Sequence, residues 1–229
     1  MKKTIAIFDL DKTLIPFDCD EAWGHFLHER GWAEHDFLSR QAAFFAQYDA
    51  GTLDIHEYQR FSIAATIKAG PVVAQQALAD FVEQRVRPHL SRAVRQLIGA
   101  HRQQGHHLLV ITATNVFVSR AVVDALGIAD LLAIDLAVDD TGWFTGQIEG
   151  TPSFREGKVT RLHTWLGAQG WQRSDVALHF YSDSTNDLPL LSVVDHPVAT
   201  NPSPDLREHA LRTGWPVLDL FGSLMLLRS

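Results

Sequence analysis

The second half of the chain alternates apolar strands with amphipathic helices, and this order constrains the fold more than any other feature of the sequence. Strands that alternate with helices form parallel sheets whose two faces are covered by the helices. We therefore predict an α/β protein with a doubly wound, Rossmann-like parallel sheet. The predicted strands are 4–8, 107–113, 176–183 and 196–200, and the predicted helices of this part are 91–105, 115–126, 158–169, 186–194 and 205–212.

A long helical block separates the first strand from the rest of this pattern. Between Asp20 and Val86 we expect helices at 20–30, 35–48, 55–70 and 71–86, with Pro71 at a favourable first helical position. The expected organisation is an α/β core of residues 1–16 and 88–229 with a helical domain, 17–87, inserted after the first strand. Segments 131–138 and 143–150 are expected to form a hairpin, and the apolar tail 218–229 a final helix packed on the core or on a second subunit.

Composition excludes several classes of protein. The net charge of −7 argues against nonspecific nucleic-acid binding, which needs a basic surface, so a small molecule is the expected partner. The single cysteine, Cys19, rules out an internal disulfide framework and suits a cytoplasmic location. No apolar run approaches the roughly 20 residues of a membrane span, so we expect no membrane association. We expect a monomer or a homodimer.

Polar residues gather where the predicted parallel strands end. Asp9 and Asp11 follow the first strand, Thr112 closes the second, and Asp183 with Asp187 follows the strand 176–183. Ligands of open parallel sheets bind at these carboxyl ends. Four carboxylates in one place would repel one another, so a cation is required there, and an all-oxygen ligand set suits Mg²⁺. Lys158, at the start of a predicted helix, is the side chain best suited to join them.

These motifs, in this order, resemble those of the haloacid dehalogenase superfamily. The matching segments are "DLDKT" at 9–13, Thr112, Lys158 and "YSDSTNDLPLL" at 181–191. The helical block resembles the cap of the phosphoserine-phosphatase-like branch of that superfamily. The resemblance covers essentially the whole chain, and it implies a Mg²⁺-dependent phosphatase that acts on a small phosphorylated metabolite.

The resemblance also implies a role for each motif residue. Asp9 would be the nucleophile that forms an aspartyl-phosphate, and Asp11 the general acid and base. Lys158 would offset negative charge in the transition state. Mg²⁺ would be bound by Asp9, the backbone carbonyl of Asp11 and Asp183, with Asp187 behind them or acting through water. Thr112 and the adjacent Ala113 would contact the phosphate, and Asn186 would lie near it.

The cap is expected to select the substrate. In phosphoserine phosphatases an acid shortly after the first motif binds the substrate amine, and a cap arginine binds its carboxylate. The matching residues here are Asp18, with Asp20 two positions later, and Arg60. Phosphoserine and histidinol phosphate are the candidate substrates, and the shortened acid with its aromatic neighbours Phe17 and Trp23 argues against phosphoserine and for a different amine-bearing ester.

Other interpretations of the same residues remain. Asp9 and Asp11 can simply end a strand, Asp18 and Asp20 can cap a helix, and Arg60 can lie on a solvated helix face. A phosphoaspartate signalling receiver also pairs an aspartate with Mg²⁺, a threonine and a lysine, but the chain length and the helical insertion argue against it. A binding protein on an inactive phosphatase scaffold is the third possibility, and the intact motifs argue against that.

Overall fold

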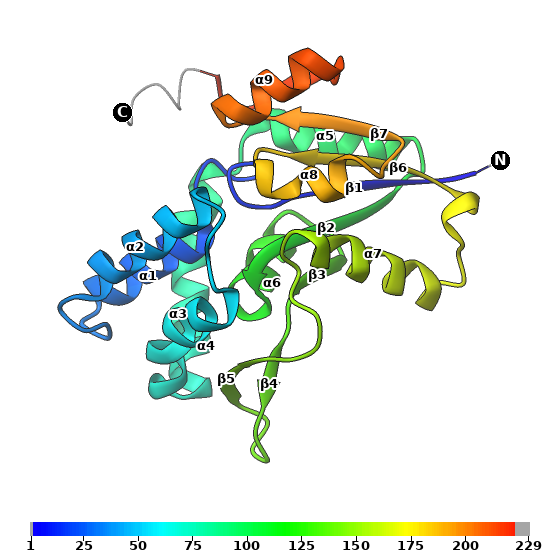
Figure 1. Cartoon of the computed structure of the whole chain (residues 1–229). Coiled ribbons are helices and arrows are strands. Elements are labelled where there is room, and N and C mark those ends of the chain that lie inside the picture. Colours follow the sequence, from blue (N-terminus) through cyan, green and yellow to red (C-terminus); the bar gives the residue numbers. More distant parts are fainter. Residues whose placement is uncertain (1, 223–229) are drawn as a thin grey trace.

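The computed structural model describes residues 2–222 and has a six-stranded parallel sheet at its centre (Figure 1). The strand order is β3-β2-β1-β6-β7-β8. Their bounds are Lys3–Phe8 for β1, His107–Asn115 for β2, Asp130–Ile134 for β3, Val176–Ser182 for β6, His196–Thr200 for β7 and Val217–Leu218 for β8. Strand β1 lies between β2 and β6 and is parallel to both, so the predicted doubly wound fold class is confirmed.

Helices cover both faces of the sheet, and strand β1 shows how the sequence directs this. Successive side chains of a strand point to opposite faces. Ala6 and Phe8 pack with helices α5 (Arg92–Gln103) and α6 (Val116–Ala125). Ile5 and Ile7 pack with α7 (Glu156–Ala168), α8 (Leu188–Leu191) and α9 (Pro204–Thr213). The side chains of these four residues, the last four of β1, are fully buried, as expected for a central parallel strand.

The helical block between β1 and α5 consists of four α-helices. They are α1 (Cys19–Glu29), α2 (Phe37–Asp49), α3 (Ile55–Ala69) and α4 (Pro71–Phe81), and α4 continues through a π-helical turn, Val82–Val86. Pro71 is the first residue of α4, as predicted, where its missing N–H costs no hydrogen bond. Figure 1 shows these helices beside the sheet, at the end where β1 runs into α1.

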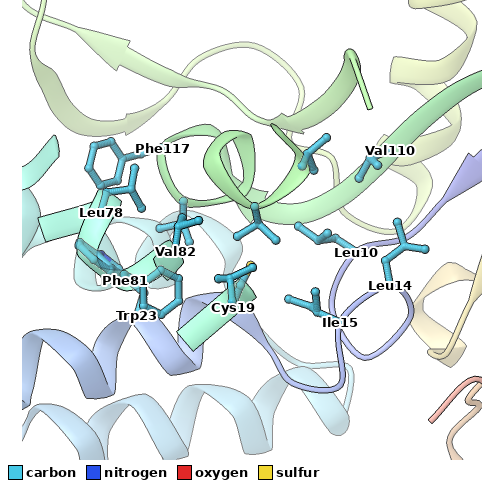
Figure 2. Close-up of a cluster of buried hydrophobic side chains, with 14 of the residues drawn as sticks. Leu10, Leu14, Ile15, Cys19, Trp23, Leu78, Phe81, Val82, Val110 and Phe117 are labelled. Atoms are coloured by element: carbon cyan, nitrogen blue, oxygen red, sulfur yellow. The ribbon is translucent and has the colours of Figure 1, made fainter. Parts of the chain in front are cut away.

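The base of the helical block shares one apolar core with the sheet (Figure 2). Trp23 of α1 and Phe81 of α4 are fully buried and pack edge to face, with ring centroids 5.4 Å apart. Phe117 of α6 packs against Trp23 at 6.0 Å, and Leu10 and Val110 extend the cluster toward the strands. The parts of α1 and α4 around Trp23 and Phe81 are therefore fixed to the sheet by packing.

Two predicted elements differ in the structure. Segment 131–138 does not form a single strand of a hairpin. Strand β3 joins the main sheet beside β2, and Asp135 separates it from the short strand β4 (Leu136–Val138). Only β4 pairs with β5 (Phe144–Ile148) in an antiparallel hairpin. The helix predicted at 186–194 is a 3-10 turn, Thr185–Asp187, followed by the four-residue α8. A helix was also predicted at 218–229. Its first residue, Leu218, is the last residue of strand β8, and residues 223–229 lie outside the described part of the chain.

Candidate active site

The loop after β1 carries the acidic pair at the carboxyl end of the sheet. Asp9 N–H donates to the Tyr181 carbonyl of β6 at 2.8 Å, which continues the pairing of the strands by one residue. Lys12 then takes a left-handed conformation with φ of 56°, which is uncommon for a side chain other than glycine. Asn201, after β7, donates its amide to the carbonyls of Lys12 and Thr13 at 3.0 and 3.2 Å. These contacts determine the position of both aspartates.

Asp9 is buried and paired with Lys158. The lysine comes from the first turns of α7, its side chain is 3% exposed, and its Nζ lies 2.9 Å from Asp9 Oδ1. Burial raises the pKa of Asp9 to about 7, although the Lys158 ammonium lowers it. Burial lowers the pKa of Lys158, but the Asp187 and Asp9 charges outweigh that effect and raise it above its usual value. The ammonium therefore stays charged beside Asp9.

Asp187 lies behind this pair. Lys158 Nζ contacts its two carboxylate oxygens at 2.7 and 2.8 Å, and the Ser182 hydroxyl donates to Oδ2 at 2.7 Å. Both oxygens of Asp187 are therefore engaged by the protein. This arrangement favours the predicted indirect role of Asp187 over direct contact with a metal.

Asp11 is held by three donors. Its Oδ1 accepts the Cys19 N–H at 2.7 Å, and its Oδ2 accepts the hydroxyls of Thr112 at 3.1 Å and Thr114 at 2.9 Å. Thr112 is fully buried and directs its hydroxyl to Asp11. Thr114 was not singled out from the sequence, although its hydroxyl two residues beyond Thr112 on an extended strand was the available signal.

Asp183 faces Asp9 across the Thr13 hydroxyl, which lies 3.3 Å from Asp9 Oδ2 and 3.4 Å from Asp183 Oδ1. Burial, followed by the charges of Asp9 and Asp187, raises the pKa of Asp183 well above its usual range. Two buried carboxylates that repel each other are a suitable place for a divalent cation with oxygen ligands. Among residues 2–222 no group of three or more His, Cys, Asp or Glu side chains forms a metal cluster. A metal bound here would thus need a backbone carbonyl in addition to Asp9 and Asp183.

The helical block closes the site into a cavity of about 50 Å³. Its floor contains Asp9, Asp11, Thr112, Ala113 and Asp183, and its walls include Asp18 and Asp20. The remaining lining residues are Lys12, Phe44, Phe45, Tyr48, Leu53, Ile55, Tyr58, Thr114 and Ser184. The cavity is therefore acidic and polar at the sheet and aromatic at the helices.

Two of the predicted substrate contacts lie elsewhere. Arg60 is exposed and lines a separate hollow of about 400 Å³ on the helical block, with Arg40 and Lys68. The reason is helical register, because Tyr58 of the same helix faces the cavity and a residue two positions later points away from it. Arg60 is thus not brought to the acidic cavity in this structure, and its contact with substrate stays a prediction.

The Asn186 side chain bonds the helical block instead of lining the cavity. Its Nδ2 donates to the Tyr48 carbonyl at 3.1 Å, and its Oδ1 accepts from Arg155 Nε at 3.1 Å. Arg155 Nη2 also donates to the Gly51 carbonyl, at 2.8 Å. The predicted position of Asn186 near the phosphate is therefore corrected, because both ends of its amide are used to hold the end of α2.

A parallel sheet with a buried aspartate–lysine pair at its carboxyl edge and a helical block beside it is the arrangement that the resemblance to the haloacid dehalogenase superfamily implies. The chain belongs to this family: the model of the haloacid dehalogenase-like hydrolases matches residues 6–192. The predicted family and fold are thereby confirmed.

Individual proteins agree with this assignment. The chain is 38% identical to a histidinol-phosphatase of Neisseria meningitidis, over 95% of this chain and 99% of that protein. It is 28% identical to a phosphoserine phosphatase of Mycobacterium tuberculosis, over 93% of this chain and 70% of that protein.

Solved structures show the same fold. A Bordetella pertussis protein of unknown function has a TM-score of 0.90 at 39% identity, over 96% of this chain and all of that one. A substrate-bound phosphoserine phosphatase has a TM-score of 0.65 at 19% identity, over 99% of both chains. In residues 2–222, no helix combines the length and apolar character needed to cross a bilayer.

Proposed function

We propose that the protein is a Mg²⁺-dependent phosphatase that hydrolyses a small phosphomonoester through an aspartyl-phosphate on Asp9. The observation that carries the proposal is the buried contact of Asp9 with Lys158 at 2.9 Å, at the edge of the sheet where ligands of such folds bind. A lysine in this position holds Asp9 in place and provides positive charge as negative charge builds up on the transferring phosphoryl group. Family membership supports the same chemistry.

Asp11 acts as general acid and base in this proposal. It donates a proton to the leaving alkoxide while Asp9 attacks phosphorus, and then it accepts a proton from the water that hydrolyses the aspartyl-phosphate. The hydroxyls of Thr112 and Thr114 support the role, because they orient the Asp11 carboxyl group through its Oδ2. Thr112 and Ala113 would contact the substrate phosphate, which is supported by their place in the cavity lining, and Thr114 of β2 lines the cavity with them.

Asp9, Asp183 and the backbone carbonyl of Asp11 would hold the Mg²⁺ ion, with Asp187 in support through Lys158. The ion would supply charge neutralisation at the phosphate and between the two carboxylates. The donor chemistry fits, because all three are hard oxygen ligands and the two buried carboxylates otherwise repel each other.

The cavity chemistry favours a cationic substrate without a carboxylate. Phosphoserine would need a positively charged residue for its carboxylate, but Lys12 is the only basic side chain that lines the cavity among the described residues, and Arg60 is turned away. Two acids and an aromatic wall suit an ammonium group and a flat heterocycle. We therefore propose histidinol phosphate as the substrate, and the 38% identity to a histidinol-phosphatase supports this choice.

We propose that residues 17–87 form the cap that admits this substrate. A cavity of about 50 Å³ holds a few water molecules, whereas ligand pockets usually measure roughly 300 Å³ or more. The end of α2 and the start of α3, which line the cavity, therefore have to move away from the sheet for entry and release, while Trp23 of α1 and Phe81 of α4 stay packed in the apolar core.

The test is a phosphatase assay on purified protein with an aryl phosphate and with histidinol phosphate. We expect Mg²⁺-dependent release of phosphate, loss of activity with EDTA, and loss of activity in Asp9→Asn. Wild-type activity in Asp9→Asn would refute the nucleophile. A stable phosphoprotein without turnover would favour a signalling receiver, and absence of activity on every phosphate ester would favour a binding protein.

A further inference from the structure

Asp20 has an incomplete set of hydrogen bonds at the wall of the cavity. The residue is 3% exposed, and its Oδ2 has no hydrogen-bond partner among the described residues. Its Oδ1 has a long contact of 3.5 Å from Asn115 Nδ2. Burial raises the pKa of Asp20 to about 6, and the neighbouring side chains of Tyr58, Ser62 and Asn115 lower it. Buried carboxylate oxygens are costly when they lack a donor, and native proteins rarely leave them so. Because Asp20 lines the cavity, a bound ligand can provide the missing donor.

Asp18 differs from Asp20, although both acids line the cavity. Asp18 Oδ1 accepts the backbone N–H groups of Asp20 and Glu21, both at 3.0 Å, and so caps the start of α1. This is the helix-capping role that the sequence left open for Asp18. Capping the helix uses one carboxylate oxygen of Asp18. The carboxylate of Asp20, the second acid of the pair, accepts no backbone N–H group among the hydrogen bonds described above.

An aromatic wall stands next to Asp20. Tyr58 and Asp20 both line the cavity, and burial, followed by the charges of Asp20 and Asp18, raises the pKa of the Tyr58 phenol. The Tyr58 hydroxyl is also buried without a hydrogen-bond partner in the described part of the chain. Phe44 and Phe45 pack on Tyr58 with ring centroids 5.5 and 6.0 Å away, and all three rings line the cavity. A flat ring with a polar edge fits between such a wall and an acid.

We propose that Asp20 Oδ2 accepts the ring N–H of a substrate heterocycle, with Tyr58 as its neighbour and the aromatic wall against the ring face. Asp18 is left to bind the substrate ammonium group. The inference rests on the proposed function and deepens it, because it assigns the two nitrogen groups of a histidinol-type phosphate to two different acids. Asp20 is then the residue that separates heterocyclic amine phosphates from simple amine phosphates.

The experiment compares two substrates in each variant. Histidinol phosphate carries an ammonium group and an imidazole, whereas 2-aminoethyl phosphate carries only the ammonium group. The readout is the ratio of their kcat/KM values, which cancels changes in folding or in the phosphoryl-transfer step. The variants are Asp20→Asn, Tyr58→Phe and Asp18→Asn, with Glu21→Gln as a matched control because Glu21 is an exposed acid in the same helical turn.

We expect Asp20→Asn to lower the ratio about 30-fold, since removing one charged partner from a buried contact is costly. Tyr58→Phe should lower it about fivefold, as expected for one hydrogen bond. Asp18→Asn and Glu21→Gln should leave the ratio within about threefold, because Asp18 contacts a group that both substrates share.

The outcomes separate this inference from the proposed function. A wild-type enzyme that does not prefer histidinol phosphate over 2-aminoethyl phosphate would refute the proposed substrate. A wild-type preference that persists in Asp20→Asn would refute the role of Asp20 alone. A ratio that falls in Asp18→Asn but not in Asp20→Asn would reverse the assignment of the two acids and so overturn the inference.

Discussion

Replacing Lys158 with methionine tests whether this one ammonium group supports both the structure and the chemistry of the site. Its Nζ lies 2.9 Å from Asp9 and 2.7 Å from Asp187, and its side chain is 3% exposed. Removing one partner of a buried ion pair typically costs about 3–5 kcal/mol, because the remaining charge is left uncompensated. We expect Lys158→Met to lose about this much stability in urea unfolding without Mg²⁺, and to lose activity by roughly 10² to 10³.

A second substitution separates the two roles. Asp187→Asn in the Lys158→Met background removes a carboxylate that has lost its partner, so we expect it to restore about 2 kcal/mol of stability. Activity should not return, because the ammonium group beside Asp9 is still absent. Lys68→Met, at an exposed position, is the control and should change stability by less than about 0.5 kcal/mol. A Lys158→Met protein as stable as wild type, or a double variant with restored activity, would refute the reasoning.

Two further predictions concern regions outside the acidic cavity. His101 bonds Tyr181 and His106, both at 2.8 Å, and burial, followed by nearby histidines, lowers its pKa from 6.5 to about 4. Between pH 4 and pH 6.5, His101 is therefore protonated in the unfolded chain and neutral in the folded protein. Its contribution to the free energy of unfolding is complete above pH 6.5 and is lost as the pH falls toward 4, by about 2 kcal/mol after allowance for solvent near the cluster. In urea titrations, His101→Gln should flatten this slope, and an unchanged slope would contradict the assignment. Arg155→Met should remove the hydrogen bond to Gly51, so amides of 50–54 should exchange hydrogen roughly fivefold faster; equal exchange rates would show that Arg155 does not hold this loop.

The sheet and the floor of the site could be predicted because they depend on local pattern and on a topological rule. Alternating strands and helices require a parallel sheet, and polar residues at the strand ends then meet at one edge. This rule predicts that Asp9, Asp11, Thr112 and Asp183 lie close together, and all four line one cavity. Their catalytic roles stay predictions.

The walls of the site were less predictable because they depend on helical register and on long-range contacts. Arg60 and Tyr58 are two residues apart on α3, yet only Tyr58 faces the cavity. Asn186 bonds to Arg155, 31 positions away, and to the carbonyl of Tyr48 in α2, 138 positions away, and no local pattern encodes these contacts. The strand break at Asp135 was not predicted for a related reason, since the residues on both sides of Asp135 in 131–138 are all apolar while the pairing partner changes from β2 to β5.

The proposed mechanism depends most directly on the aspartyl-phosphate intermediate on Asp9. Acid quenching during turnover of histidinol phosphate or an aryl phosphate, followed by mass spectrometry of peptides, should find a phosphoryl group on Asp9. With the aryl phosphate, whose leaving group needs little protonation, Asp11→Asn should accumulate more of this phosphoprotein than wild type, because its hydrolysis lacks the general base. Phosphoryl transfer to a residue other than Asp9, or steady turnover with no trace of phosphoprotein in either enzyme, would contradict the account.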